Sequence, residues 1–425
     1  MAYVIIGNAA AAISAVESIR KIDTKKPIIL ISDEPYHTYS RPLISYYLGD
    51  KVTEDTMRYR GENFYKKHNV TTYFGKKVVE IICDKKQVRL EDDTFISYDK
   101  LLIATGSKPF VPPMKGLTGK ENIHTFLKLE DAVELKQKVK KDMRVVIVGA
   151  GLIGLKAAEG LHKLCDDITV VELADSVLST ILDRKAADIV QKHITQEGIK
   201  FIFNTTISEI EGETKVEKLT LQDGRVIPCD LLVVAIGVRP NVDIAQTAGI
   251  DVNRGIVVDD SMQTNIADIY AAGDVTESLD VASDTRRVLA LWPNAYRQGE
   301  VAGCSMAGGD AIFDSAFAMN AIGFFGLPMI TAGLVNVDET QAEQYEVQLV
   351  YDEEEKWIKK FIIKQNQLKG FILISKVDRA GIYTSLIKEG IDIRQLDRAL
   401  TSDAFGLIAF SKELRAEKML KGGRI

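Results

Sequence analysis

Residues 144–154 read RVVIVGAGLIG, an apolar run that leads into a glycine-rich turn. The GxGxxG spacing that begins at residue 149 predicts a strand, a tight turn and the start of a helix. The first glycine permits the turn, the second lets the backbone approach a pyrophosphate, and the third lets the helix pack on the strand. The next apolar run, residues 167–171, ends at Glu172, and an acid about 20 positions after the motif can bind both ribose hydroxyls. This stretch therefore predicts a βαβ unit that binds a dinucleotide.

The charge around Glu172 predicts which dinucleotide is bound. After Glu172 no lysine or arginine follows until Arg184. A 2′-phosphate would be repelled by the carboxylate and would find no cation nearby. We therefore expect NADH to be preferred over NADPH.

A degenerate copy of the motif stands at the N-terminus. Residues 3–6 form an apolar run, and residues 7–12 read GNAAAA, so alanine replaces the second and third glycines. Alanine carries a Cβ where the backbone would touch phosphate, so this copy alone is the weaker signal. Its apolar strand at residues 100–103 resembles the strand at 231–236, and the two units look like an internal repeat.

Bulk properties place the chain among globular proteins. Its 425 residues predict about three domains. The net charge is −6, and the acidic and basic residues are interspersed along the chain. There is no basic segment suited to nucleic acid or anionic lipid, no N-terminal targeting pattern, and no apolar run of the roughly 20 residues that a membrane span needs. We expect a cytoplasmic protein that binds neither nucleic acid nor membrane.

The four cysteines and five histidines are scattered, and no close pair of them has metal-ligand or disulfide spacing. The composition therefore predicts no metal site and no disulfide framework. Apolar spacing predicts helices at 130–141 and 293–307. From about residue 314 the pattern predicts an antiparallel meander, and we interpret the acidic run at 352–355 as a solvated turn between strands.

Several motifs occur in the order seen in the pyridine nucleotide-disulfide oxidoreductase superfamily, and together they cover residues 1 to about 310. They are Gly7-x-Ala9, Ala104-Thr105-Gly106-Ser107-x-Pro109, Gly149-x-Gly151-x-x-Gly154, Ala235-Ile236-Gly237-x-Arg239-Pro240-Asn241 and Ala271-Ala272-Gly273-Asp274. The C-terminal part, which contains the motif Phe324-Phe325-Gly326-Leu327-Pro328, is similar to the interface domain of NADH:rubredoxin oxidoreductases and of NADH-dependent nitrite reductase modules.

This resemblance implies an α/β fold of three domains. Two are Rossmann-like, one for FAD and one for NADH, and the third is an α+β interface domain. We expect the FAD domain at residues 1–110 and 241–313, the NADH domain at 111–240 and the interface domain at 314–425. The interface domain can serve a homodimer or can dock the electron acceptor.

The resemblance also implies the binding residues. For FAD they are Gly7, Ala9, Ala12, Ser32, Asp33, Arg41, Pro42, Ser45, Ala104, Thr105, Gly106, Gly273, Asp274, Asn294 and Ala295. For NADH they are Gly149, Gly151, Ile153, Gly154, Glu172 and Gly237. The chemistry agrees, because a carboxylate such as Asp274 can accept hydrogen bonds from sugar hydroxyls, and N–H groups at a helix start can stabilise negative charge on a reduced flavin.

The chain departs from the superfamily at two places. Disulfide reductases carry reactive cysteine in the helix that here spans residues 43–48, but this chain has none before Cys83. Thiol-dependent reactions are therefore disfavoured. Relatives also often have a lysine at the position of Tyr46 and a glutamate at the position of Lys156. We hypothesise that Lys156 supplies the cation near the flavin N5 atom and assign Lys156 and Tyr46 catalytic roles. Trp292 and Phe325 are candidates for shielding the flavin face.

The function that the sequence favours is an NADH:acceptor oxidoreductase, in which electrons pass from NADH through FAD to a small redox protein such as rubredoxin. Two alternatives stay open. One is an NADH oxidase that uses oxygen, and the other is a flavin- and NADH-binding sensor or assembly protein similar to apoptosis-inducing flavoproteins.

Overall fold

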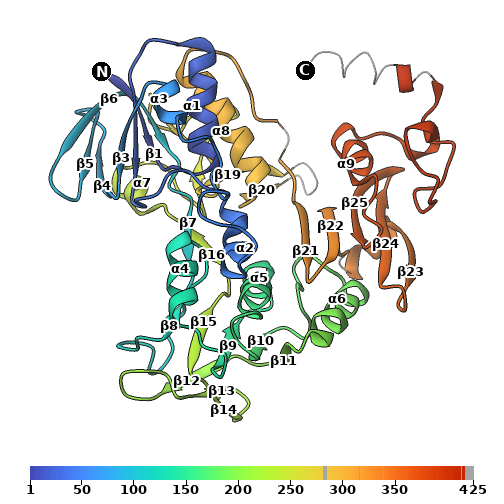
Figure 1. Ribbon diagram of the computed structural model, residues 1–425. Helices are drawn as coiled ribbons and strands as arrows, with labels where there is room; N and C mark the ends of the chain where they lie inside the picture. Colours follow the sequence, from blue (N-terminus) through green and yellow to red (C-terminus); the bar gives the residue numbers. More distant parts are fainter. Residues whose placement is uncertain (281–284, 315, 338, 413, 417–425) are drawn as a thin grey trace.

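The computed structural model describes residues 1–280, 285–314, 316–337, 339–412 and 414–416. Its core consists of two α/β units, and a third unit lies beside the second (Figure 1). Among the described residues, no helix is long and apolar enough to cross a membrane.

The first sheet combines strands from two distant parts of the chain. Its order is β3-β2-β1-β6-β5-β4, and β18 pairs with β6 on the side that β1 leaves free. Strands β1, β2, β3, β18 and the second half of β6 are parallel, whereas β4, β5 and the first half of β6 form an antiparallel meander. The strands are β1 (Ala2–Ile6), β2 (Ile28–Ser32), β3 (Val70–Phe74), β4 (Val78–Ile82), β5 (Gln87–Leu90), β6 (Phe95–Ile103) and β18 (Ile269–Ala271).

The second sheet repeats this parallel arrangement. Its order is β11-β10-β9-β15-β8, with the strand that precedes the glycine-rich turn at its centre. The prediction of two related α/β units is confirmed. The strands are β8 (Ile123–His124), β9 (Arg144–Val148), β10 (Asp167–Val171), β11 (Lys200–Ile202) and β15 (Leu231–Val234).

Smaller sheets complete these two units. One is antiparallel and contains β12 (Ile207–Glu211), β13 (Lys218–Leu221) and β14 (Val226–Pro228), and another contains β17 (Ile256–Val257), β19 (Thr276–Asp280) and β20 (Thr285–Val288). The two segments that link the large sheets pair with each other as β7 (Ser107–Pro109) and β16 (Val238–Pro240). Thr105 and Asn241 reinforce this ribbon, because each side chain donates a hydrogen bond to the backbone carbonyl of the other residue, at 3.0 and 2.9 Å.

The helices follow the apolar spacing of the sequence. They are α1 (Ala10–Ile22), α2 (Ile44–Leu48), α3 (Phe64–Lys67), α4 (Leu129–Lys138), α5 (Leu152–Leu161), α6 (Arg184–Gln196), α7 (Asp243–Thr247), α8 (Trp292–Met306) and α9 (Ala380–Glu389). The helices predicted at 130–141 and 293–307 are α4 and α8. Helix α4 ends three residues earlier than predicted, because Val139 is extended.

Small residues let α1 and α8 pack almost backbone to backbone. A Cβ added at Gly299 of α8 would lie 2.1 Å from the Ala11 carbonyl oxygen, and one at Gly303 would lie 2.4 Å from that of Ala15. The two glycines are four residues apart and so share one face of α8. Helix α1, which follows the degenerate motif, therefore packs closely on α8, and the glycines that allow this contact belong to α8.

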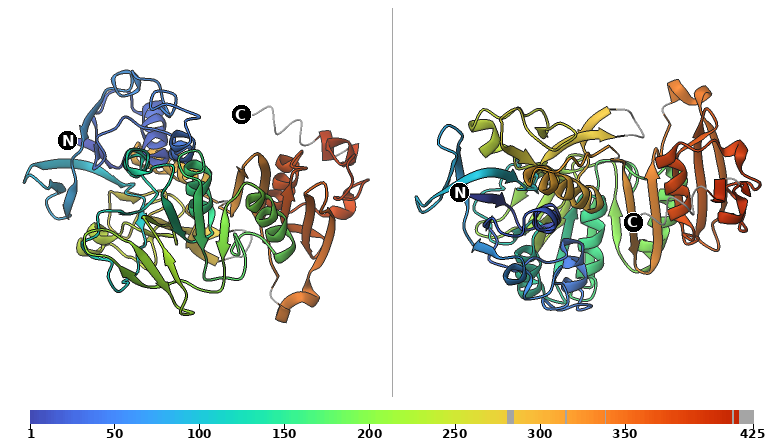
Figure 2. Two further views of the ribbon diagram at one scale, coloured as in Figure 1. Left: turned by 60° about the horizontal axis from the view of Figure 1, so that its bottom comes forward. Right: turned by 90° about the horizontal axis from the view of Figure 1, so that it is seen from above.

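The C-terminal unit is a five-stranded antiparallel sheet, and the predicted meander corresponds to three of its strands, β23, β24 and β25. Its order is β21-β22-β25-β24-β23, and α9 packs on one face. Its strands are β21 (Met319–Phe324), β22 (Leu327–Gly333), β23 (Glu346–Asp352), β24 (Trp357–Lys364) and β25 (Gln367–Ile374). All views show this sheet beside α6 of the second unit (Figure 2).

Ion pairs fix the C-terminal sheet to α6. Glu353, in the turn predicted to be merely solvated, lies 2.8 Å from Lys185 and 3.0 Å from Lys192. These two lysines lower the pKa of Glu353 to about 2. Deeper in the interface Lys360 pairs with Asp183 at 2.7 Å, and Asp183 also caps α6 by accepting a hydrogen bond from Ala186 N–H. The acidic turn is thus a contact between units, which a charge run in the sequence does not reveal.

Replacement of Gly299 by alanine is expected to lower the thermal midpoint. The added methyl group must displace backbone of α1, and overpacking of this kind costs about 1–3 kcal/mol. Gly381→Ala is the matched control, because a Cβ there meets nothing within 4 Å. In helix α9 that alanine should be neutral or stabilising by up to about 1 kcal/mol. Thermal unfolding followed by circular dichroism compares the two variants, and equal midpoints would contradict the close packing of α1 on α8.

Candidate functional site

A cavity of about 600 Å³ opens at the carboxyl ends of β1, β2, β6 and β18. This volume lies within the range typical of small-molecule and cofactor sites, and strand ends are where parallel sheets bind ligands. The residues predicted for FAD that line it are Gly7, Ala9, Ser32, Asp33, Arg41, Ala104, Thr105, Gly106, Gly273, Asp274 and Ala295.

The turn after β1 presents a helix N-terminus to the cavity. Gly7 has φ of 127°, and a Cβ there would lie 2.2 Å from the Ala104 carbonyl oxygen, so only glycine fits. Ala9 is the N-cap of α1, and no side chain caps the helix. The free N–H groups and the helix dipole therefore favour an anion at this point. Ala9 is extended, with φ of −98°, so its Cβ introduces no backbone strain.

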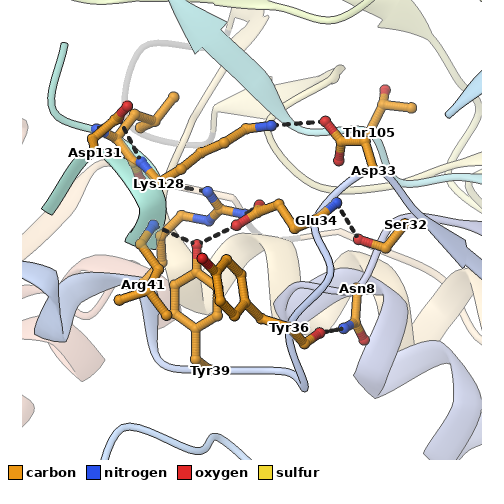
Figure 3. Close-up of polar contacts among 12 residues, drawn as sticks. Asn8, Ser32, Asp33, Glu34, Tyr36, Tyr39, Arg41, Thr105, Lys128 and Asp131 are labelled. Carbon is orange, nitrogen blue, oxygen red and sulfur yellow. Dashed lines mark hydrogen bonds and ion pairs between the residues drawn. The ribbon is translucent and has the colours of Figure 1, made fainter. Parts of the chain in front are cut away.

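Arg41 adds a fixed positive charge to the cavity wall (Figure 3). Its guanidinium pairs with Glu34 at 2.6 Å, and the Tyr39 hydroxyl donates to the other oxygen of Glu34, also at 2.6 Å. Burial opposes the charged form, but Tyr39 and Glu34 raise the pKa of Arg41 above its ordinary value. The guanidinium therefore stays charged and is held in position.

Asp274 supplies an acceptor in the same cavity. It follows β18, and desolvation by burial raises the pKa of its carboxyl, while Arg41 and a hydrogen bond from Ser107 oppose this shift. A buried acceptor of this kind suits the hydroxyl groups of a sugar or polyol.

Four of the residues predicted for FAD do not line this cavity. Ala12 is fully buried in α1, and Pro42 lies in the single 3-10 turn before α2. Ser45 is 5% exposed, and its hydroxyl has no hydrogen-bond partner. Asn294 is buried and donates its amide to the Phe317 carbonyl at 3.5 Å. Trp292, by contrast, lines the cavity.

The turn after β9 has the geometry of a second dinucleotide site. Cβ atoms added at Gly149 and Gly154 would lie 2.5 and 1.9 Å from backbone oxygens, whereas one at Gly151 would meet nothing within 4 Å. The open space is therefore at the N-cap of α5, where a phosphate can approach the backbone. Ile153 lies in the first turn of that helix, and Gly237 follows β15 with φ of 128°.

Glu172 lies directly beside this turn. Its carboxylate accepts hydrogen bonds from Ala150 N–H at 2.6 Å and from Ala174 N–H at 2.8 Å. The backbone thus holds the carboxylate at the end of β10, next to the glycine-rich turn. Binding of ribose hydroxyls by Glu172 stays a prediction.

Lys156 and Tyr46 line a separate, smaller hollow of about 90 Å³ between α2 and α5. The Lys156 ammonium pairs with Glu159 at 2.5 Å and donates to the Gly323 carbonyl at 3.1 Å. It also lies 4.7 Å from the centre of the Tyr46 ring. The charge of Lys156 is thus paired with Glu159 in this structure. A role for Lys156 near the flavin N5 atom stays a prediction.

Phe325 lines the same small hollow and not the large cavity. Its carbonyl contacts His193 Nε2 at 3.1 Å, and its N–H donates to Glu159 at 3.3 Å. Its ring meets His162 edge-on, with the centroids 5.4 Å apart. The tip of the β21–β22 hairpin is therefore anchored on α5 and α6. Shielding of the flavin face by Phe325 finds no support in this geometry.

Sequence reasoning missed several residues that line the large cavity, including Asn8, Glu34, Tyr36 and Lys128. Asn8 Oδ1 accepts from the Tyr65 hydroxyl at 2.7 Å, and its amide donates to the Tyr36 carbonyl at 3.1 Å. Glu34 could have been found from the Asp33-Glu34 pair at the end of the strand. Tyr36 and Lys128 carried no signal, because only the folded chain brings them to the cavity.

The donors and acceptors of the large cavity fit FAD. The N-terminus of α1 and the Arg41 guanidinium suit its pyrophosphate, and the carboxylates of Asp33 and Asp274 suit its hydroxyl groups. None of the four cysteines lines the cavity. Within the described part of the chain there is also no group of three His, Cys, Asp or Glu residues that could hold a metal ion.

Residues 1–299 match the family described as pyridine nucleotide-disulphide oxidoreductase. The assimilatory nitrate reductase electron transfer subunit of Bacillus subtilis is 32% identical over 91% of this chain. That alignment covers only 49% of the relative, so the chain spans about half its length. The NADH-dependent phenylglyoxylate dehydrogenase subunit epsilon of Aromatoleum evansii is 30% identical, and the alignment covers 93% of each protein. The rubredoxin-NAD(+) reductase of Pseudomonas putida is 31% identical over 72% of this chain and 80% of its own length.

Replacement of Asp274 by asparagine is expected to stabilise the FAD-free protein at pH 7 and to weaken FAD binding. The raised pKa of Asp274 means that folding disfavours its ionised form. Ionisation of Asp274 therefore lowers the free energy of unfolding of the native chain, and it does so only at pH values where the carboxyl is ionised. The gain should therefore vanish as the pH falls and Asp274 becomes neutral. Thermal scans at several pH values test the first effect and FAD titration the second. If the FAD-free Asp274→Asn variant were less stable than the wild type at pH 7, Asp274 would not be the destabilising buried carboxylate that we describe.

Replacement of Glu172 by glutamine is expected to narrow the preference for NADH over NADPH by about tenfold. The change removes a negative charge beside the glycine-rich turn and keeps one oxygen to accept the hydrogen bond from Ala150 N–H. The ratio of the two kcat/KM values measures this preference. Glu197→Gln, at an exposed acid that follows α6, controls for net charge. Wild-type protein that used NADPH better than NADH would contradict the role of Glu172.

Proposed function

The chain belongs to the pyridine nucleotide-disulphide oxidoreductase family, and we propose that it is an NADH-dependent flavoprotein that passes electrons to a small redox protein of the rubredoxin type. FAD, when bound, would supply the chemistry that links a two-electron hydride donor to a one-electron acceptor. The residues of the chain bind and orient the two dinucleotides and exclude water from the space between them.

The observation that carries this proposal is the position of the cysteines. Cys165 and Cys229 are buried, and Cys83 and Cys304 are partly buried, all outside the large cavity. Burial raises the pKa of Cys229 to about 12 and also raises the pKa of Cys165 and of Cys83. The three thiols with a raised pKa are poor nucleophiles at neutral pH, and all four cysteines lie outside the large cavity. Electrons must therefore leave the flavin without a thiol intermediate.

The named relatives support transfer to a protein acceptor. One is an electron transfer subunit, and another is a rubredoxin reductase. Both names describe proteins that deliver electrons to another redox centre. The proposal assigns the same class of acceptor to this chain.

The residues around the cavity have separate roles in this proposal. The N-terminus of α1 and Arg41 hold the phosphates, and Asp274 accepts hydrogen bonds from the polyol chain. Glu172 selects NADH. Trp292 packs edge-on against Tyr59, with the ring centroids 4.8 Å apart, and forms an apolar part of the wall that limits the access of water.

An anaerobic NADH titration followed by the visible flavin spectrum tests the proposal. We expect stoichiometric bleaching that air reverses slowly and that oxidised rubredoxin reverses quickly. Immediate recovery in air would instead indicate an oxidase, and the absence of bleaching would indicate a binding protein.

Alkylation by iodoacetamide tests the absence of a thiol step. The modified protein should keep its rates of flavin reduction by NADH and of rubredoxin reduction, because the exposed part of the site contains no cysteine. A variant in which serine or alanine replaces all four cysteines is the matched control. Loss of electron transfer on alkylation of the native chain, but not of this variant, would contradict the proposal.

A further inference from the structure

Residues 127–131, which we call the strap, close one side of the large cavity. They lead from β8 of the second sheet into α4, yet Leu127 and Lys128 line the cavity of the first unit. The Lys128 ammonium pairs with the Asp33 carboxylate at 2.7 Å (Figure 3). A segment of one unit thus completes the cofactor cavity of the other.

Three further contacts fix the strap to the loop between β2 and α2. Leu129 N–H donates to the Tyr39 hydroxyl at 3.1 Å, and the Tyr36 hydroxyl donates to the Glu130 carboxylate. Arg41 donates to the Leu127 carbonyl at 3.4 Å. Because Arg41 also lines the cavity, the wall of the cavity and the strap share one cation.

Lys128 is an unfavourable choice for the structure of α4 alone. It is the N-cap of α4, a position that favours Ser, Thr, Asp or Asn, and a positive charge there opposes the helix dipole. Asp131 offsets part of this by accepting hydrogen bonds from the N–H groups of Leu127 and Lys128. A residue that breaks a local rule points to a role elsewhere, and the only acid that the Lys128 side chain is seen to pair with in the described chain is Asp33.

We propose that Lys128 is a cofactor-retaining residue that closes the Asp33 end of the FAD cavity, so that FAD leaves only after the Lys128–Asp33 pair opens and the strap lifts. The proposal rests on the FAD site and is independent of the electron acceptor. Binding of FAD should in turn hold the strap, and with it the start of α4.

The test compares rates of FAD release, measured by the rise in flavin fluorescence after the holoenzyme is diluted into a large volume of buffer, where released FAD does not rebind. Lys128→Ala should release FAD about fivefold faster at low salt, as expected for loss of a partly exposed ion pair. Lys128→Arg keeps the pair and should restore a rate near that of the wild type. High salt should accelerate release from the wild type and have little effect on Lys128→Ala.

Lys138→Ala is the matched control, because this exposed lysine lies at the other end of α4 and does not line the cavity. Its rate of FAD release should equal that of the wild type. The proposal is overturned if Lys128→Ala releases FAD at the wild-type rate, or if Lys138→Ala accelerates release equally.

Hydrogen exchange gives a second readout that does not depend on electron transfer. In the wild type, FAD should slow exchange at the amides of residues 127–131 relative to the FAD-free protein, and in Lys128→Ala this protection should shrink. Unchanged exchange on FAD binding would refute the coupling. Faster FAD release by Lys128→Ala in a protein that fails to reduce rubredoxin would reject the proposed acceptor and leave the role of Lys128 intact.

Discussion

A steric constraint at the end of the central strand of each sheet determines the rest of the structure. At Gly7 and at Gly149 the chain turns so tightly that the carbonyl oxygen of a neighbouring strand occupies the place of a Cβ. Positive φ at both residues is a second, independent constraint, because an L-residue with a side chain is strained in that backbone conformation. The turn directs the start of a helix toward the carboxyl edge of the sheet, and this edge is where both dinucleotide sites form. In each unit the neighbouring strands and the helix that follows pack around this turn.

The two turns meet the constraint in different ways. In the second unit, Gly154 provides the close contact between helix and turn. In the first unit alanines replace the second and third glycines of the motif, and Gly299 and Gly303 of α8 allow a close approach to the backbone of α1 at Ala11 and Ala15. The GNAAAA sequence therefore marks a site whose packing depends on residues almost 300 positions away. A motif search confined to the N-terminus cannot detect this contact, although the four-residue spacing of the glycines in α8 is visible in the sequence.

Sequence patterns predicted the fold well because its strands and helices are strongly periodic and its turns contain glycine. The family resemblance implied the cavity residues that follow strand ends, such as Asp33, Ala104 and Asp274, and these residues do line the large cavity. Sequence patterns could not predict Lys128 or Tyr36, which reach the cavity from an interdomain segment and a loop. The pairing of Lys156 with Glu159 and of Glu353 with two lysines of α6 depends on side-chain packing between units, which no spacing rule describes.

The pairing of β18 with β6 has a consequence for synthesis of the chain. The first sheet gains β18 only after residues 269–271 have been made, and the cavity wall is complete only when Asp274 and Ala295 have followed. Because chains fold as they emerge, the second α/β unit can form on the ribosome while the first still lacks a strand and part of its wall. The ribbon of β7 and β16 brings the ends of the second unit together, as in insertions that fold on their own. FAD is then bound late in biogenesis, because the cavity that begins at Gly7 is complete only after Asp274 and Ala295 have been made.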